Sequence, residues 1–249
     1  MTKIFNFEKY ISPLDSNRFG FKVAKIDNYD IDPESVVSEF KNLDVDLVIS
    51  RVDGKDIELV NKLEELGFRV KDCQLKYKFD LKNFKPYEIN PAENYRIRDA
   101  KEADIPILTR FTEESFAGYG HYFADKRLDA KKCMGIYKDW VHRSCLDKNV
   151  ADKVFVAEIN GEAAGYLTFK IFEKDNLKYA AGGLGAVSKL YRNKSVFQAI
   201  ILHGLKWGDE INLEWEEHNV LTTNYSVNRS FSKLGFRVVN SYYTLHGWI

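Results

Sequence analysis

The stretch that decides the fold reads Val187-Ser-Lys-Leu-Tyr-Arg-Asn-Lys-Ser-Val-Phe197. It follows a strand-like run and precedes a segment of helical periodicity, so we expect a helix to begin at Val196. Amide groups at the start of a helix carry partial positive charge, and Arg192 and Lys194 place full charges beside them. The stretch therefore predicts a site for a pyrophosphate; the alternative is a solvated basic turn before a helix.

A second signal follows, in which Asn224 leads a helix that ends at Leu234-Gly235-Phe236. The string Leu-Gly-Phe-Arg-Val occurs at 66–70 and again at 234–238, each time after a strand and a helix. In both copies we expect the glycine to cap the helix with positive φ and the phenylalanine to return to the core. The shared order indicates duplication of one strand–helix–strand unit. In the first copy we expect a strand at 46–52 and a helix at 55–66. In the second copy we expect a strand at 218–223 and a helix at 225–234.

The remaining elements are read from apolar periodicity and turn residues. Asn160-Gly161 predicts a tight hairpin, and Asp32-Pro33 predicts the start of a helix that reaches Phe40. The stretch 13–24 is expected to be a turn that runs into a strand. Further strands are expected at 95–98, 154–159, 163–172 and 177–187, and further helices at 102–116, 130–145 and 196–210.

Composition excludes several classes of protein. The 249 residues contain 37 Lys plus Arg and 37 Asp plus Glu, so no net field favours nucleic acid or an anionic membrane. The three cysteines, Cys73, Cys133 and Cys145, are scattered without metal-ligand spacing, so we expect reduced thiols and no metal. The amino-terminal residues lack the apolar run of a signal peptide, and no run is long enough to span a membrane. We therefore expect a cytoplasmic protein.

Two prolines place the domain boundary. Pro86 and Pro91 lie within 83–94 and discourage helix on either side. We predict a first domain over 1–82, a linker over 83–94 and a second domain over 95–249.

The loop and the second helix together resemble the GCN5-related N-acetyltransferase (GNAT) superfamily. Its pyrophosphate loop commonly reads V-x-P-x-Y-R-G-K-G-x-G, and in register with that pattern are Val187, Tyr191, Arg192 and Lys194. Lys189 stands at the proline, and Asn193, Ser195 and Phe197 stand at three glycines. The resemblance implies a mixed α/β sheet with the GNAT acyl-CoA N-acyltransferase fold over 95–249, and a partial GNAT-like α/β half-domain before it.

The resemblance also implies the cosubstrate, acetyl-CoA, and the residues that hold it. Strand 179–186 is poor in bulky side chains, and its counterpart in the superfamily bonds the pantetheine arm and polarises the thioester carbonyl. Phe231 stands where the superfamily often has a tyrosine that protonates the departing thiolate, so the general acid is open: Tyr191, Tyr225, a water or none. The cofactor-binding residues implied are Leu184, Gly185, Ala186, Val187, Arg192, Asn193, Lys194, Ser195, Val196, Phe197, Asn224 and Phe231.

In GNAT proteins the connection between the first two helices of the domain shapes the acceptor pocket. Here it reads Gly118-Tyr-Gly-His-Tyr-Phe-Ala-Asp-Lys-Arg-Leu128. His121 could accept a proton near neutral pH, and the expected acceptor-binding residues are Tyr119, Tyr122, Lys126 and Arg127. The other histidines, His142, His203, His218 and His246, are expected to have packing or surface roles.

Within the superfamily, the Leu-Asp-Ser-x-x-Phe-Gly entry at 14–20 and the leading half-domain are similar to TDP-fucosamine acetyltransferases. That similarity implies acetyl transfer to the amine of a nucleotide-linked amino sugar, in surface-polysaccharide biosynthesis. One alternative keeps the acyl-CoA and changes the acceptor to a peptide, an amino acid or an antibiotic. The other is a GNAT module that binds CoA without catalysis. The expected partner is a small-molecule acceptor, and a homodimer is a possible oligomeric state.

Overall fold

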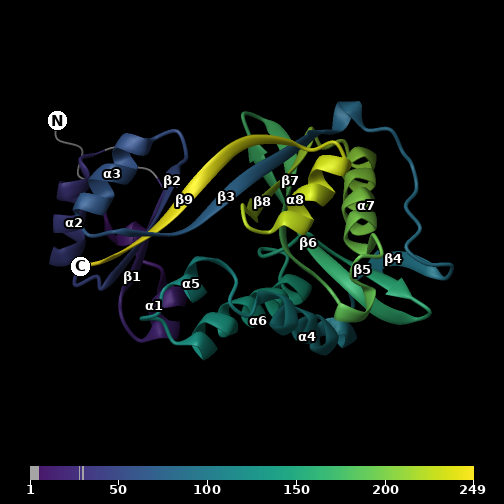
Figure 1. The fold of residues 1–249 in the computed structure, drawn as a ribbon, viewed down its shortest axis with the longest axis horizontal. Coiled ribbons are helices and arrows are strands. Elements are labelled where there is room, and N and C mark those ends of the chain that lie inside the picture. The colour runs from purple at the N-terminus through teal and green to yellow at the C-terminus, as the bar shows by residue number, and fades with distance from the viewer. Residues whose placement is uncertain (1–5, 28, 30) are drawn as a thin grey trace. The chain divides into compact units, whose positions relative to one another are not determined.

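The computed structural model describes residues 6–27, 29 and 31–249, and it divides into two compact units (Figure 1). Unit 1 contains the described residues up to Gln74 together with 118–133 and 240–249. Unit 2 contains 75–117 and 134–239. The predicted domain limits are thus not the limits of the units, because the segment 118–133 and the carboxyl-terminal end both belong to unit 1. The expectation that the amino-terminal stretch is not a signal peptide falls in part on residues 1–5, which lie outside the described residues.

Unit 1 is a small α/β layer. Strand β1 pairs parallel with β2, and β2 pairs antiparallel with β9, with Leu47 opposite Trp248. Its core gathers Val36, Phe40, Leu63 and Phe68 from the helices and their exits. The elements are η1 (Glu8–Tyr10), α1 (Pro13–Phe19), β1 (Val23–Ile26), α2 (Pro33–Asn42), β2 (Leu47–Asp53), α3 (Ile57–Glu65), the first half of β3 (Arg69–Asp80), α5 (Gly120–Ala124) and the end of β9 (Arg237–Trp248).

The expectation of a turn at 13–24 is wrong in part, since Pro13–Phe19 forms helix α1. The Ser12 side chain accepts a hydrogen bond from the Asp15 amide, Pro13 occupies the first turn, and Gly20 ends the helix at φ 84°. These three features are the ordinary start and stop signals of a short helix. The predicted cap at Asp32 is confirmed, because its side chain accepts from the Ser35 amide.

Unit 2 is built on a larger mixed sheet. The strand order is β8-β7-β6-β5-β4, with the second half of β3 beside β8. The pairs β4–β5, β5–β6 and β6–β7 are antiparallel, and β7 pairs parallel with β8. The elements are η2 (Leu81–Asn83), β4 (Tyr95–Asp99), η3 (Glu102–Asp104), α4 (Ile105–Phe116), α6 (Ala130–Leu146, whose residues from Met134 on belong to this unit), β5 (Lys153–Ile159), β6 (Glu162–Lys174), β7 (Leu177–Val187), η4 (Lys189–Tyr191), α7 (Val196–Glu210), β8 (Trp215–Leu221) and α8 (Tyr225–Lys233).

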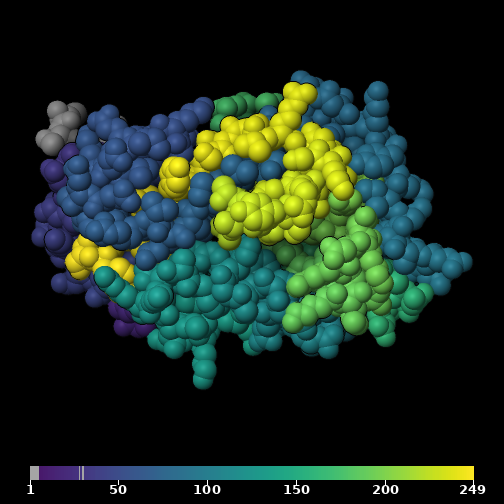
Figure 2. Space-filling model, in the orientation of Figure 1, coloured from purple at the N-terminus to yellow at the C-terminus, as the bar shows by residue number. Residues whose placement is uncertain are grey.

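Helices cover both faces of this sheet. The Tyr166 hydroxyl of β6 lies 2.5 Å from Thr112 Oγ1 of α4. Leu167 and Phe169 of the same strand belong to the hydrophobic core that includes residues of α7. Successive side chains of a strand point to opposite faces, so α4 and α7 lie on opposite faces of β6. Helices α7 and α8 pack side by side and form part of the surface in Figure 2.

The predicted caps and hairpin are confirmed. Gly67 and Gly235 have φ of 90° and 87° after α3 and α8, and Phe68 and Phe236 are buried. Asn160 and Gly161 both have positive φ between β5 and β6, as a tight hairpin requires. Strand β7 and helix α7 have the predicted bounds. In the described part of the chain, no helix combines the length and the apolar character needed to cross a membrane.

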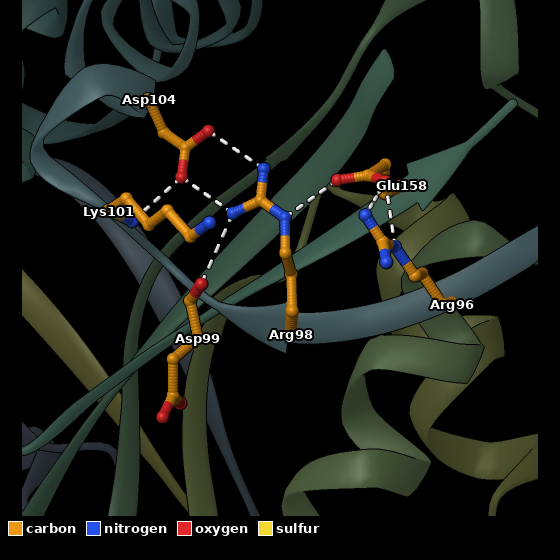
Figure 3. A network of polar contacts seen from close by, with 6 residues as sticks. All are labelled: Arg96, Arg98, Asp99, Lys101, Asp104 and Glu158. Carbon is orange, nitrogen blue, oxygen red and sulfur yellow. Dashed lines mark hydrogen bonds and ion pairs between the residues drawn. The ribbon is translucent and has the colours of Figure 1, made fainter. Parts of the chain in front are cut away.

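An ion-pair network fixes the start of α4 to the sheet (Figure 3). Arg98 of β4 donates two hydrogen bonds to Asp104, at 2.7 and 2.9 Å, and one of 2.6 Å to Glu158 of β5. Arg96 donates a bond of 2.7 Å to the second oxygen of Glu158. Hydrogen bonds from Arg98 are the largest cause that lowers the pKa of both carboxyl groups.

Gly67 offers a clean test of the cap, because a Cβ placed on it meets no atom within 4 Å. We expect Gly67→Ala to lower the free energy of unfolding by about 1 kcal/mol through backbone conformation alone, and Gly67→Asn to lower it less. Urea unfolding of both variants measures this. Equal stability of Gly67→Ala and the parent would show that the positive φ is not needed.

The network predicts how stability responds to acid. Because the folded pKa of Glu158 and Asp104 lies below the ordinary value, their contribution is complete above the ordinary carboxyl pKa and is lost as pH falls through the folded pKa. We expect Glu158→Gln to lower the free energy of unfolding at neutral pH and to flatten its fall between about pH 5 and pH 3. Glu173→Gln, at an exposed carboxylate of β6, is the control and should follow the parent curve. A parent-like acid slope in Glu158→Gln would contradict the assignment.

Candidate functional site

Strand β7 has one open edge near its end. Its ladder with β8 runs from Tyr179↔Trp215 to Gly182↔His218 and stops there. Its ladder with β6 continues on the other side as far as Gly165↔Val187. Residues 183–187 are therefore held by β6 alone, and β7 and β8 part beyond Gly182.

The backbone of this segment presents amide groups to the open edge. The Ser188 amide donates to the Ala164 carbonyl at 2.9 Å. Residues in an antiparallel ladder alternate between bonding their partner and pointing away from it. By that alternation Ala186 bonds toward β6, and the N–H groups of Gly185 and Val187 point toward the open edge. The Val187 carbonyl does the same, and it accepts a 3.3 Å hydrogen bond from Arg192 Nε.

A β-bulge precedes these amides. Leu167 pairs with Gly185 but Phe169 pairs with Gly182, so two residues of β7 stand opposite Thr168. The Leu184 amide is satisfied by the buried Thr168 side chain, which accepts at 2.8 Å from Oγ1. Bulges of this kind re-aim a strand next to a functional site. Here the bulge lies between the last β7–β8 pair and the outward-pointing amides.

The predicted pyrophosphate loop joins the end of β7 to α7. Asn193 has φ of 62° and Ser195 has φ of 59°, so both adopt the left-handed conformation that glycine adopts easily. Helix α7 begins at Val196, and its first hydrogen bond back to the loop runs from Ala199 to the Ser195 carbonyl. The amides of residues 196–198 therefore have no partner within the helix. The backbone has the shape that the missing glycines would give it.

Basic side chains flank the loop. Arg192, Asn193, Lys194 and Ser195 are exposed. Arg192 also donates a 3.1 Å hydrogen bond to the Ser115 side chain of α4. Lys194 lies over the Tyr191 ring, with its Nζ 5.5 Å from the ring centre. Two positive charges thus stand beside the unpaired amides.

The side chain of Phe197 points into the packing of α7 against α8. Its ring meets Phe231 edge to face, with centroids 6.1 Å apart. An atom of the same ring lies 3.4 Å from the place that a Cβ on Gly185 would occupy. Phe197 replaces a glycine without turning its ring onto the loop.

Two predicted contact residues lie on α8. Asn224 caps the helix, and its Oδ1 accepts from the Val227 amide at 3.4 Å. Phe231 is buried between Tyr77 and His218, with ring centroids 5.2 and 4.5 Å away. It has no group that titrates, so the structure offers no proton donor at this position.

The predicted acceptor residues belong to unit 1, and the predicted cofactor residues belong to unit 2. His121 Nδ1 is 2.9 Å from His246 Nε2, and His246 Nδ1 is 2.8 Å from Asp125 Oδ2, which also accepts from Trp248 at 3.0 Å. Burial is the largest cause that lowers the pKa of both histidines, that of His121 well below its usual value. Burial opposes ionisation of Asp125, but the hydrogen bonds from Trp248 and His246 lower its pKa to about 2. The chain of contacts holds a neutral histidine pair on an ionised carboxylate.

The other residues of that segment differ in exposure. Tyr122 is buried, and its hydroxyl lies 3.3 Å from Asp15. Tyr119 is half-buried, whereas Lys126 and Arg127 are exposed and Arg127 lies over the Trp248 ring at 5.2 Å. Their role in binding an acceptor stays a prediction. Over the described residues, no cluster of three or more His, Cys, Asp or Glu side chains could hold a metal ion.

Three polar residues near these sites were not predicted to be functional; of these, His246 was expected to have a packing or surface role. Asp125 and His246 complete the chain of contacts to His121, and Glu216 bonds His218 on β8. Asp125 and His246 lie far apart in sequence, so no local pattern indicates their pairing. Glu216 and His218 carry a usable signal, because residues two apart on a strand share a face.

Comparison with known proteins assigns the fold. Neither a family model nor a curated protein matches the sequence. Solved structures do match: a tandem GNAT protein from the clavulanic acid biosynthesis pathway is 14% identical, with a TM-score of 0.61 over 90% of this chain and 74% of that one. A GCN5-related N-acetyltransferase from Kribbella flavida is 9% identical, with a TM-score of 0.60 over 90% and 80%.

A third match is a GCN5-related glucosamine N-acetyltransferase region of a fungal multi-domain GH3 β-N-acetylglucosaminidase. It is 12% identical, with a TM-score of 0.56 over 86% of this chain and 27% of that one. Together these likenesses show that the chain has the GNAT fold, as the loop and its surroundings predict.

The positive φ of Ser195 can be tested directly. We expect Ser195→Val to lower the free energy of unfolding by about 1–2 kcal/mol, because a β-branched residue resists the left-handed conformation, and Ser195→Gly to be neutral or stabilising. Lys189→Val, at an exposed residue of η4 without positive φ, is the control. The free energy of unfolding of the three variants is measured in urea. If Ser195→Val is as stable as the parent, the loop has another conformation at this residue.

Proposed function

We propose that this protein is an acetyl-CoA-dependent N-acetyltransferase that acts on the amino group of a nucleotide-linked amino sugar. One observation carries the proposal: the open edge of β7 leads directly into a loop whose backbone and charges suit a pyrophosphate. The two parts belong to one continuous segment, 183–198. A pyrophosphate with an extended arm is the ligand that fits both.

The residues of unit 2 fit such a ligand. The amides of 196–198 and the charges of Arg192 and Lys194 would hold the pyrophosphate. The amides of Gly185 and Val187 would bond the arm as a neighbouring strand does, and an amide of this segment would stabilise the oxyanion of the thioester carbonyl. When bound, acetyl-CoA supplies the acetyl group as a thioester, and a neutral amine attacks its carbonyl carbon.

The acceptor is the less constrained part of the proposal. Support for an amino sugar comes from the sequence pattern and from the basic, aromatic segment 118–128, whose aromatic residues and exposed Lys126 and Arg127 suit a compact anionic acceptor. The glucosamine acceptor named for the fungal region is a property of that protein. It makes an amino sugar a reasonable first acceptor to test.

Two other functions are kept as alternatives. An acyl-CoA transferase with a peptide, amino-acid or antibiotic acceptor would use the same β7 edge. A module that binds CoA without catalysis is favoured by Phe231, which cannot donate a proton, and by the three replaced glycines. Binding and turnover separate these readings.

Calorimetry with CoA tests the site before any acceptor is known. We expect binding, and we expect Lys194→Ala to weaken it about tenfold through the loss of a charged hydrogen-bond donor. Lys206→Ala, at an exposed lysine farther along α7, is the matched control and should bind as the parent does. Absence of CoA binding would refute both enzyme readings and the module.

Turnover is measured as thiol release from acetyl-CoA, with TDP-amino sugars, glucosamine, amino acids, peptides and an aminoglycoside as acceptors. We expect release with a nucleotide-linked amino sugar. Thiol release with only another class of acceptor would contradict the amino-sugar assignment and identify that class as the acceptor. Tight CoA binding without thiol release with any acceptor would favour the non-catalytic module.

A further inference from the structure

His218 occupies the closed end of the open β7 edge. It pairs with Gly182, the last residue of β7 that β8 holds. Its ring lies over Gly182, so that any side chain at that position would overlap the Nδ1–Cε1 edge of the imidazole. The imidazole ring of His218 therefore occupies space that is free only because Gly182 has no Cβ.

A buried carboxyl group orients the imidazole. His218 Nε2 lies 2.7 Å from Glu216 Oε1, and Glu216 is fully buried. Burial raises the pKa of Glu216, and the hydrogen bond from His218 opposes that rise. The second oxygen of Glu216 has no hydrogen-bond partner among the described residues. Since Nε2 is taken by Glu216, Nδ1 is the nitrogen that faces β7.

The surroundings of this pair are otherwise apolar. The rings of Phe231, Phe236 and Phe169 lie 4.5, 5.6 and 6.0 Å from the His218 ring. A buried pair of ionisable groups contributes little stability compared with apolar side chains of similar volume. Packing alone therefore does not account for a carboxyl–imidazole pair at this place, and the pair is a candidate for a role in chemistry.

The geometry of β7 would bring the reactive end of a bound arm toward this pair. The loop that would hold the pyrophosphate follows Val187, at the outer end of the strand. An arm that lies along the open edge runs back past Gly185 toward Gly182, roughly 16 Å away at the rise of a strand. The edge closes at Gly182↔His218. The far end of such an arm, which would carry the thioester, would then lie beside His218.

We propose that His218 is a catalytic residue that protonates the departing sulfur from Nδ1, and that Glu216 is its positioning residue. This inference rests on the proposed function. As the amine nitrogen bonds to the carbonyl carbon, the carbon–sulfur bond breaks and its electron pair stays on sulfur. The protonated imidazole gives the Nδ1 proton to that sulfur, and solvent takes the extra proton of the new amide. Solvent then reprotonates His218, so the reaction releases one thiol and one amide.

A measurement that needs no acceptor tests the contact. Protein labelled with ¹³C in its five histidines is titrated with CoA and with desulfo-CoA, and the His218 ring signal is assigned with His218→Gln. We expect the His218 signal to move on binding CoA and to move much less with desulfo-CoA, while calorimetry gives similar affinities. Tight binding of both with equal shifts would overturn the assignment of His218 alone. No binding of CoA would overturn the proposed function, and this inference with it.

Kinetics supply the second test. The Gln side chain of His218→Gln can still donate to Glu216 but cannot supply the proton, so we expect kcat to fall about 100-fold with CoA affinity unchanged. Glu216→Gln keeps the imidazole and should lower kcat less. A kcat for His218→Gln within twofold of the parent, in a variant that unfolds at the same urea concentration, would overturn the proposal. If that variant does not fold, the ¹³C titration of the parent decides, with the His218 signal assigned by elimination from variants of the other histidines.

Discussion

The rest of the site depends on where one ladder of hydrogen bonds ends. Strand β8 holds β7 only as far as Gly182, while β6 holds it to Val187. This difference leaves two amides of β7 without a strand partner on one side, next to a loop with unpaired helix amides of its own. An unsatisfied amide is stabilised by any acceptor that reaches it. The fold thereby creates a ligand edge from backbone groups, which few side-chain changes can remove.

The loop shows how such a site persists when its sequence departs from the usual pattern. Glycine is common in phosphate loops because it takes positive φ at little cost. Asn193 and Ser195 take the same conformation here, Asn at a modest cost and Ser at a larger one. Phe197 replaces a third glycine by directing its ring toward α8. At Asn193 and Ser195 the backbone conformation is one that glycine adopts easily, although the residue is not glycine.

Much of the fold could be predicted because local signals were strong. The small residues of β7, the apolar periodicity of α7 and the glycine caps at Gly67 and Gly235 fix their elements without tertiary context. Helix α1 was missed because its cap and proline also suit a turn. The pairs His246–Asp125 and His218–Glu216 were missed because their meaning depends on burial and, for the first, on contact between distant parts of the chain. The sequence indicated the cofactor edge but not the groups that could move protons.

The most direct test of the account follows the amide groups of β7 by NMR as CoA is added. The account predicts that the amide signals of Gly185 and Val187 shift and become protected from hydrogen exchange. The Ala186 amide, which bonds toward β6, should change far less and serves as an internal reference. Bound CoA with unchanged Gly185 and Val187 amides would contradict the central claim that the open edge of β7 is where the ligand lies.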